Sequence, residues 1–365
     1  MDVTHILLSA QSPDGQIRTA AEETLKQFQE QNFPHFLLSL SVALSNDQKP
    51  PESRRLAGII LKNSLGAKDS GRKEELAQRW VSVDPSIKAQ IKDSLLQTLG
   101  SSVSEARHTS SQVVAKIAAV EIPRREWQDL IERLLNNMKH PAATAALKQA
   151  TLESLGYVCE EVSDQDLEQE QVNAVLTAVV QGMTQPEHSS EVRLAAVKSL
   201  YNALDFAETN FRNEMERNFI MQVVCQAAVS NESEIRQAAF ECLVCISSMY
   251  YDILEPYMDT LFTLTANAVK GDEESVALQA VEFWSSICDE EIEIQETYED
   301  EGSSVAPHSH FIEKALPLLV PMLLETLLKQ EEDQDQEDGT WNLSMAGGTC
   351  LGLVARTVGD AIVPW

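Results

Sequence analysis

The sequence contains nearly the same phrase twice, and this repetition limits the possible folds more than any other feature. The phrase SEVRLAAVKSL at residues 190–200 returns about 43 residues later as SEIRQAAFECL at residues 233–243. Related segments align with it along the whole chain. The positions that align with its arginine are Arg18, Arg55, Arg107, Lys148, Arg193, Arg236, Ala277 and Ala346. A repeat of roughly 40–45 residues is typical of helical solenoids.

Each copy of the phrase has the pattern of an amphipathic helix, with apolar residues on one face. In the second copy this stripe consists of Ile235, Ala239, Leu243 and Ile246. Second apolar helices lie between the copies, often with Pro near their start, as in NFPHFLLSLSVAL, IPRREWQDLIERLLNNM, LEPYMDTLFTLTANAV and ALPLLVPMLLETLL. A hairpin of two such helices cannot bury its own apolar face, so it must stack on its neighbours.

No run with the two-residue period of a β-strand stands between turn signals. We therefore predict an all-α, right-handed and superhelical α-solenoid of about eight HEAT-type hairpins. The expected domain is a single solenoid over residues 1–365. Its repeats are expected at residues 1–31, 32–75, 84–120, 124–162, 168–206, 211–250, 254–292 and 310–360, with an acidic loop at 331–341 inside the last repeat.

Composition and length place the chain among globular proteins. It has 365 residues, 43% of them hydrophobic, and it lacks an apolar run of the roughly 18–20 residues that span a bilayer. The start MDVTHILLSAQSPDG has neither the basic region nor the cleavage site of a signal peptide. The six cysteines lie within apolar helical phrases, so we expect reduced thiols, no disulfides and a location in the cytosol or a compartment continuous with it.

The charge is strongly negative, with 28 Lys and Arg against 57 Asp and Glu. Such a surface repels nucleic acid and anionic membranes and favours basic partners. The alternative interpretation is that the negative charge only keeps the protein soluble, as acidic surfaces do for many cytosolic proteins. The segments CDEEIEIQETYEDE and KQEEDQDQEDGTW are dense enough to form local acidic patches.

Signals for catalysis or metal binding are weak. Cys242 and Cys245 form a lone C-x-x-C pair in the middle of a predicted helix, whereas redox motifs use a helix N-terminus. His308 and His310 lack further ligands at suitable spacing apart from the acidic run. The segment AGGTCLG is interpreted as a helix with small packing residues, and phosphate-binding and nucleophile motifs are absent. We predict no enzyme activity, no cofactor and no metal.

Several strings are more specific than a generic HEAT phrase: LAGIILKNSL (56–65), QRWVSVD (78–84), ERNFIMQVVCQA (216–227), VALQAVEFWSSICDEE (276–291) and the acidic tract that ends at Trp341. They resemble the amino-terminal half of the importin-β family of nuclear transport receptors, in matching order along the chain. The resemblance implies a monomeric carrier that binds basic cargo directly or through importin-α. It also implies contacts with Phe-Gly nucleoporins, cargo release on binding Ran-GTP, and a location in cytoplasm, nucleus and nuclear-envelope pores. The chain then ends inside a longer solenoid.

The resemblance also implies a Phe-Gly nucleoporin site between outer helices of the fifth and sixth repeats. Its residues would be Leu176, Thr177, Val180, Glu216, Phe219 and Ile220, with Tyr257 at a second site nearby. Burial of one Phe ring contributes roughly 1.5–3 kcal/mol, so a single contact is weak and linked contacts bind by avidity. The alternative is that these residues belong to the core between repeats.

Two further partner sites follow from the resemblance. Ran would contact Lys62, Asn63 and Lys68 on an inner helix, and an acidic loop of Glu331, Glu332, Asp333, Asp335, Glu337 and Asp338. Trp341, at the end of that loop, would stack on the basic helix of importin-α, and adaptor binding should be weak because most of its surface lies in later repeats. The alternatives are an ordinary solvated loop and a buried Trp341.

The other class of function that fits a HEAT solenoid is a scaffold that assembles other proteins, as phosphatase scaffolds do. A scaffold requires neither Ran nor Phe-Gly peptides, whereas a transport receptor must bind both. Periodicity alone supports only the helical scaffold, and the transport function depends on the resemblance.

Overall fold

The computed structural model of the chain describes residues 2–184, 187–300, 309–328 and 341–365, with the backbone alone for 298–300. No strand occurs within these ranges, and the predicted all-α fold of HEAT-type helical hairpins is confirmed. Within the same ranges, no helix is both long enough and apolar enough to cross a bilayer. The chain forms two compact units, Met1–Phe206 (unit 1) and Ala207–Trp365 (unit 2).

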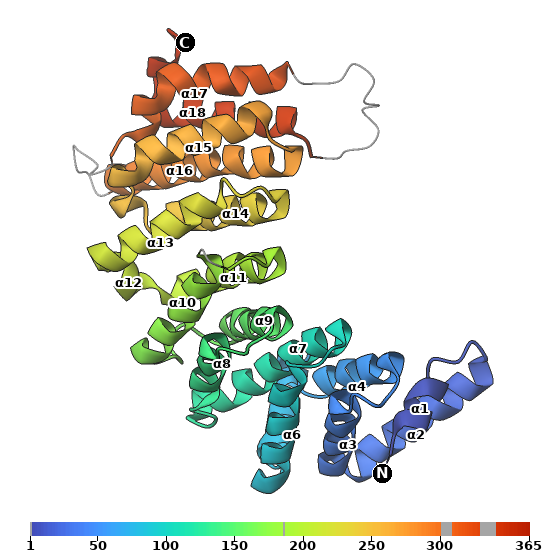
Figure 1. Cartoon of the computed structure of the whole chain (residues 1–365). Coiled ribbons are helices and arrows are strands. Elements are labelled where there is room, and N and C mark those ends of the chain that lie inside the picture. Colours follow the sequence, from blue (N-terminus) through green and yellow to red (C-terminus); the bar gives the residue numbers. More distant parts are fainter. Residues whose placement is uncertain (1, 185–186, 301–308, 329–340) are drawn as a thin grey trace. The chain divides into compact units, whose positions relative to one another are not determined.

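Unit 1 is built from two layers of helices. One layer places α4, α7, α9 and α11 side by side, and the other contains α3, α6, α8 and α10 (Figure 1). The helices are α1 Thr4–Ser9, α2 Gly15–Gln31, α3 Phe33–Ser45, α4 Pro51–Asn63, α5 Ser70–Val81, α6 Pro85–Thr98, α7 Ser104–Glu121, α8 Leu130–Lys139, α9 Ala145–Glu161, α10 Gln169–Met183 and α11 Ser190–Ala203, with 3-10 turns η1 Ile122–Arg124 and η2 Leu204–Phe206.

Unit 2 repeats this arrangement with α14, α16 and α18 in one layer and α15 and α17 in the other. Its helices are α12 Glu208–Arg212, α13 Glu214–Ala227, α14 Ser233–Met249, α15 Met258–Gly271, α16 Glu274–Asp300, α17 Phe311–Leu327 and α18 Leu343–Val358, with 3-10 turns η3 Tyr251–Ile253, η4 Glu255–Tyr257 and η5 Gly359–Ile362. The repeat boundaries assigned from the sequence stay a prediction.

The core follows the predicted stripes. Ile235, Ala239, Leu243 and Ile246 on α14 are all buried. Burial of such stripes against the neighbouring hairpins is the main stabilising term of a stacked repeat.

The arginine of the repeated phrase ties the preceding loop to the start of its helix. In three copies one terminal nitrogen of the guanidinium donates a hydrogen bond to a serine carbonyl oxygen in that loop. The pairs are Arg18 with Ser12 (2.9 Å), Arg107 with Ser101 (2.8 Å) and Arg236 with Ser230 (2.8 Å). The repeated phrase therefore forms a helix and also fixes the path of the loop that leads into it.

The same position also links neighbouring repeats. The Nη2 and Nε atoms of Arg236 lie 2.5 and 2.7 Å from the two carboxylate oxygens of Asp272, the residue that caps the end of α15. Their hydrogen bonds hold the pKa of Asp272 below its ordinary value. In the aligned segment that contains Arg55, this arginine is exposed. Its neighbour Arg54 is buried, and the Nε atom of Arg54 lies 2.8 Å from the carbonyl oxygen of Leu44.

Proline starts some of the second helices but not the last. Pro34 lies in the first turn of α3, as expected, whereas Pro317 and Pro321 lie inside α17. The reason is that α17 begins earlier, at Phe311, whose amide nitrogen donates to the buried carboxylate of Glu291 at 2.6 Å. This side chain satisfies a backbone donor at the helix start that would otherwise lack a partner.

Candidate functional site

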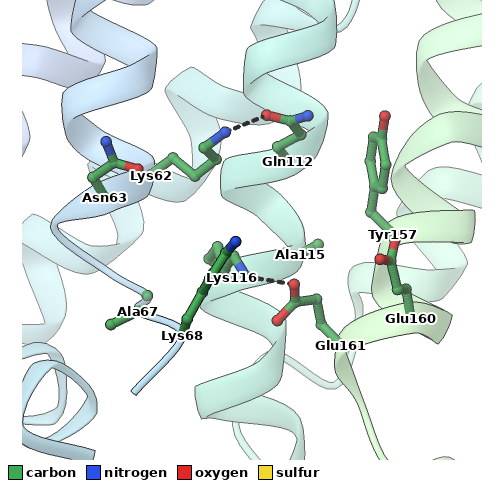
Figure 2. A pocket seen from close by; sticks show the side chains of 11 residues that line it. Lys62, Asn63, Ala67, Lys68, Gln112, Ala115, Lys116, Tyr157, Glu160 and Glu161 are labelled. Atoms are coloured by element: carbon green, nitrogen blue, oxygen red, sulfur yellow. Dashed lines mark hydrogen bonds and ion pairs between the residues drawn. The ribbon is translucent and has the colours of Figure 1, made fainter. Parts of the chain in front are cut away.

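Unit 1 contains a cavity of about 430 Å³ between α4, α7 and α9. We call it the lysine groove, because three lysines stand on one side of it and two glutamates on the other (Figure 2). Its lining residues are Lys62, Asn63, Gly66, Ala67, Lys68, Gln112, Ala115, Lys116, Tyr157, Glu160 and Glu161.

Local structure explains how the lysines reach the groove. Lys62 and Asn63 are the last residues of α4, and the chain then turns through a short loop that carries Lys68 before α5 begins. Gly66 lies close to α7 on this course, since a Cβ atom there would lie 2.8 Å from the Cδ atom of the flexible Lys116 side chain, which would have to move. The loop therefore lies close against α7 and places Lys68 beside the end of α4.

Hydrogen bonds hold two of the lysines. The Nζ atom of Lys62 donates to Oε1 of Gln112 at 2.9 Å, and Lys116 forms an ion pair with Glu161 on α9 (Figure 2). Lys68 is exposed. The groove thus presents positive charge from α4, its loop and α7 and negative charge from α9, which suits a partner surface with charges of both signs.

The structure brings together the residues predicted from the sequence for one part of the Ran site, since Lys62, Asn63 and Lys68 all line this cavity. Sequence reasoning missed the partners on α7 and α9, Lys116, Gln112 and Tyr157. They stand on the neighbouring helices of the same layer, so the only signal in the sequence was the repeat itself.

The predicted Phe-Gly site is divided between the two units, and each half is described by itself. On α10 of unit 1, Leu176 and Val180 are buried, whereas Thr177 is exposed and donates its hydroxyl to the carbonyl of Asn173 at 2.7 Å. Burial of the two aliphatic residues fits the alternative that they are core. The groove between α10 and α13 stays a prediction.

In unit 2, Phe219 on α13 is 51% exposed, which is unusual for a Phe, while Ile220 beside it is buried. Glu216 is exposed and accepts a hydrogen bond from Asn210 at 2.6 Å. Tyr257 is half-buried, and its hydroxyl is held by Arg217 at 3.1 Å. Phe219 is thus the predicted site residue with an exposed aromatic ring, and its role in binding stays a prediction.

Unit 2 also has a cavity of about 570 Å³ between α15 and α17, with both apolar and charged lining residues, which sequence reasoning missed. Phe262, Trp284 and Phe311 are among its lining residues, and Leu318, largely exposed, lines it too. Glu255 and Lys314, also among the lining residues, form an ion pair at 3.4 Å.

The acidic residues predicted to contact Ran lie outside the described residues; they are Glu331, Glu332, Asp333, Asp335, Glu337 and Asp338. Trp341, which follows them, is 52% exposed and precedes α18. The alternative of a buried Trp341 is therefore wrong, and a stacking role stays a prediction.

The residues weighed for redox or metal chemistry have other surroundings. Cys242 and Cys245 lie inside α14, and none of the six cysteines, all of which are among the described residues, forms a disulfide. Burial raises the pKa of the thiols of Cys159 and Cys225 to about 12 and about 11. His310 lies beside Glu313, while His308 falls outside the described residues. Among the described residues, no group of three or more His, Cys, Asp or Glu side chains is arranged to hold a metal ion.

Comparison with known proteins gives two family matches. Residues 21–101 match the importin-beta N-terminal domain, and residues 102–264 match the IPO5-like TPR repeats. Over its whole length the chain is 60% identical to importin subunit beta-1 of Arabidopsis thaliana and 44% identical to that of Schizosaccharomyces pombe. The chain spans 42% of the length of each of these relatives.

Solved structures of importin-β are also similar to the chain. Yeast importin-β (Kap95p) is similar with a TM-score of 0.92 at 37% identity, over 100% of this chain and 43% of that one. Kap95p with RanGDP gives a TM-score of 0.89 at 37% identity, and the Kap95–Nup1 complex gives 0.87 at 38%; each covers 99% of this chain and 42% of the other. The chain belongs to the importin-β family, and it corresponds to the amino-terminal part of that family's members.

Proposed function

We propose that the chain is the amino-terminal part of a nuclear import receptor that acts by binding alone. The observation that carries this proposal is the 60% identity with importin subunit beta-1 along the entire chain. Its partners would be Ran-GTP, Phe-Gly nucleoporins, basic cargo and, weakly in this part of the receptor, importin-α. A monomer that shuttles between cytoplasm and nucleus through the pores is the state that fits these partners.

Binding to Ran is supported from two directions. Kap95p binds RanGDP and induces its switch loops to adopt the GTP-bound conformation. In this chain, the lysine groove gathers Lys62, Asn63 and Lys68 into one site. If the same conformation is recognised here, the GDP form must change shape before it binds, and that cost reduces its apparent affinity. The GTP form should therefore bind more tightly, and the acidic residues of 331–338 would add a second contact that competes with basic cargo.

The proposal is tested by titrating the chain with Ran-GTP and Ran-GDP at low and moderate salt. We expect tighter binding of the GTP form, weakened by salt because charged contacts are screened. Changing the six carboxylates at 331–338 to amides should weaken binding at low salt by roughly tenfold. The control variant changes Asp289, Glu293 and Glu296 of α16 to amides, which removes charge from unit 2 outside the loop and should leave the affinity nearly unchanged.

Equal affinity for both nucleotide forms, or no binding, would contradict the receptor function. The chain would then be a HEAT scaffold whose likeness to import receptors lies in its architecture. The loop variant removes six charges and the α16 control removes three. An equal loss of binding free energy per charge removed in both would show that net charge, rather than the loop, attracts Ran.

Binding to Phe-Gly nucleoporins is tested at Phe219, the exposed aromatic residue of α13. Changing Phe219 to Ser should weaken binding of a peptide with several Phe-Gly repeats by roughly threefold to tenfold, because one apolar contact among several is lost. The matched control is Met215→Ser on the same helix, an apolar side chain that is 82% exposed and outside the predicted site. Equal losses in both variants, measured by surface plasmon resonance, would remove Phe219 from the site.

A further inference from the structure

Four side chains from three neighbouring helices form one hydrogen-bonded chain beside the lysine groove. Lys62 of α4 donates from Nζ to Oε1 of Gln112 at 2.9 Å. The Nε2 atom of Gln112 lies 3.2 Å from Nε2 of His108, one turn earlier on α7. The Nδ1 atom of His108 lies 3.4 Å from Oε2 of Glu153 on α9.

The chemistry of these groups fixes the direction of each bond. An ammonium can only donate, so Lys62 requires the carbonyl oxygen of Gln112, and the amide nitrogen then faces His108 as a donor. His108 must therefore accept at Nε2, which leaves its proton on Nδ1, directed at the carboxylate of Glu153. The chain is complete only while His108 is neutral.

Binding of a second proton to His108 disrupts this chain of hydrogen bonds. Protonation from solvent at Nε2 places an N–H group against the amide N–H of Gln112, and two donors repel each other. Rotation of the amide by half a turn would present its carbonyl oxygen to His108, but its NH₂ group would then face the ammonium of Lys62. One carbonyl oxygen cannot serve both cations in the observed geometry.

We propose that His108 and Lys62 compete for the carbonyl oxygen of Gln112, so that protonation of His108 releases Lys62 into the lysine groove. Gln112 is then a positioning residue, and the groove has two states. With His108 neutral, Lys62 is tied to α7. With His108 charged, Lys62 is free to contact an acidic partner surface, and the imidazolium adds positive charge next to it.

The charged and titratable groups that face His108 come from two helices. Glu153 on α9 raises the pKa of His108 above its ordinary value, while burial and Lys62 on α4 oppose this rise. Tyr157 on α9 packs its ring edge-on, with centroids 5.9 Å apart. The helices α3 and α6 also pack on α7, and the two charged side chains that shift the pKa of His108 are Glu153 on α9 and Lys62 on α4. Because the pKa of His108 is raised, this residue takes up its second proton at a higher pH than an ordinary histidine does.

The coupling is tested by an NMR titration of His108 in four forms of the chain: unchanged, Lys62→Met, Gln112→Met and both together. With Gln112 present, removing Lys62 frees the carbonyl oxygen, so the proton affinity of His108 should rise roughly fivefold. With Met at position 112, only the direct repulsion from Lys62 remains. In that background, Lys62→Met should raise the proton affinity of His108 by less than about twofold. The control Lys68→Met, which removes a lysine lining the same groove, should also give less than about twofold.

Equal rises in both backgrounds would overturn the proposal, because the carbonyl oxygen would then play no part. The unchanged protein gives an independent readout that needs no variant. The side-chain amide signals of Gln112 should shift with pH at the same midpoint as the His108 ring signals, and amide signals that ignore the His108 titration would also overturn it.

The consequence for binding rests on the proposed function. Binding of Ran-GTP should strengthen as pH falls through the His108 titration, by roughly threefold, and Gln112→Met should flatten this profile. If Ran does not bind at all, the proposed function fails while the NMR coupling can still hold. If Ran binds with the same pH profile in both forms, the link between the switch and the groove is wrong.

Discussion

Changing Glu121 to Ala is expected to lower the free energy of unfolding of unit 1 by about 3–5 kcal/mol. Glu121 ends α7 and is 1% exposed. Its carboxylate accepts from Nε1 of the buried Trp80 at 3.0 Å and from Nζ of Lys92 at 2.8 Å. The change would leave the buried indole N–H of Trp80 without its acceptor. It would also leave the Lys92 ammonium, whose side chain is only 18% exposed, with the ring of Trp127 at 5.0 Å in place of a carboxylate. It would also remove the two hydrogen bonds by which α5 and α6 are connected to Glu121 of α7.

Urea unfolding followed by circular dichroism measures this loss. The matched control is Glu126→Ala, which removes an exposed carboxylate 3.6 Å from Lys88 and should cost less than about 1 kcal/mol. The double variant Glu121→Gln with Lys92→Met keeps an acceptor for Trp80 and removes both charges, so it should recover most of the stability. A loss at Glu121 no larger than at Glu126 would show that water reaches the buried carboxylate.

Changing Gly347 to Ala is expected to destabilise unit 2 by about 2–3 kcal/mol. Gly347 lies on α18 where it packs against α17. A Cβ atom there would come within 1.8 Å of Oγ1 and 3.0 Å of Cβ of Thr326, and within 3.4 Å of the carbonyl oxygen of Leu323. Only the hydroxyl can move by rotation, so the two helices must separate.

The neighbouring glycine provides the control. Gly348 faces solvent, and a Cβ atom there would make only an ordinary contact, 3.5 Å from Cδ2 of Leu327. Gly348→Ala should therefore raise stability by up to about 1 kcal/mol through helix propensity. Adding Thr326→Ala to Gly347→Ala removes the closest atom and should restore part of the loss. Thermal unfolding of the variants measures the difference, and equal effects at both glycines would contradict the close contact.

Much of the fold could be predicted from the sequence because burial in a stacked repeat leaves a periodic pattern. The stripe from Ile235 to Ile246 is an example. The pattern could not predict which of two adjacent, similar residues is buried. Arg54 and Arg55 are adjacent and alike, and only the packing decides which is buried. The start of α17 was missed for a similar reason, since the capping carboxylate of Glu291 comes from another helix.

The candidate site was predictable to a smaller extent. Family resemblance indicated Lys62 and Lys68, and the structure places both in one cavity. It did not indicate Gln112 or His108, whose importance depends on hydrogen bonds between helices that lie far apart in the sequence. Contacts of this kind have no local signal, because each partner alone is an ordinary polar residue on a helix surface.

The bonds from Arg18, Arg107 and Arg236 to serine carbonyl oxygens also bear on how such a chain can change length over evolution. Each bond spans a fixed stretch of backbone, so inserting one residue between Ser230 and Arg236 would carry the carbonyl out of reach of the guanidinium. We therefore expect insertions among homologous chains to accumulate in connections that lack this bond, while the three loop segments that it spans do not grow longer.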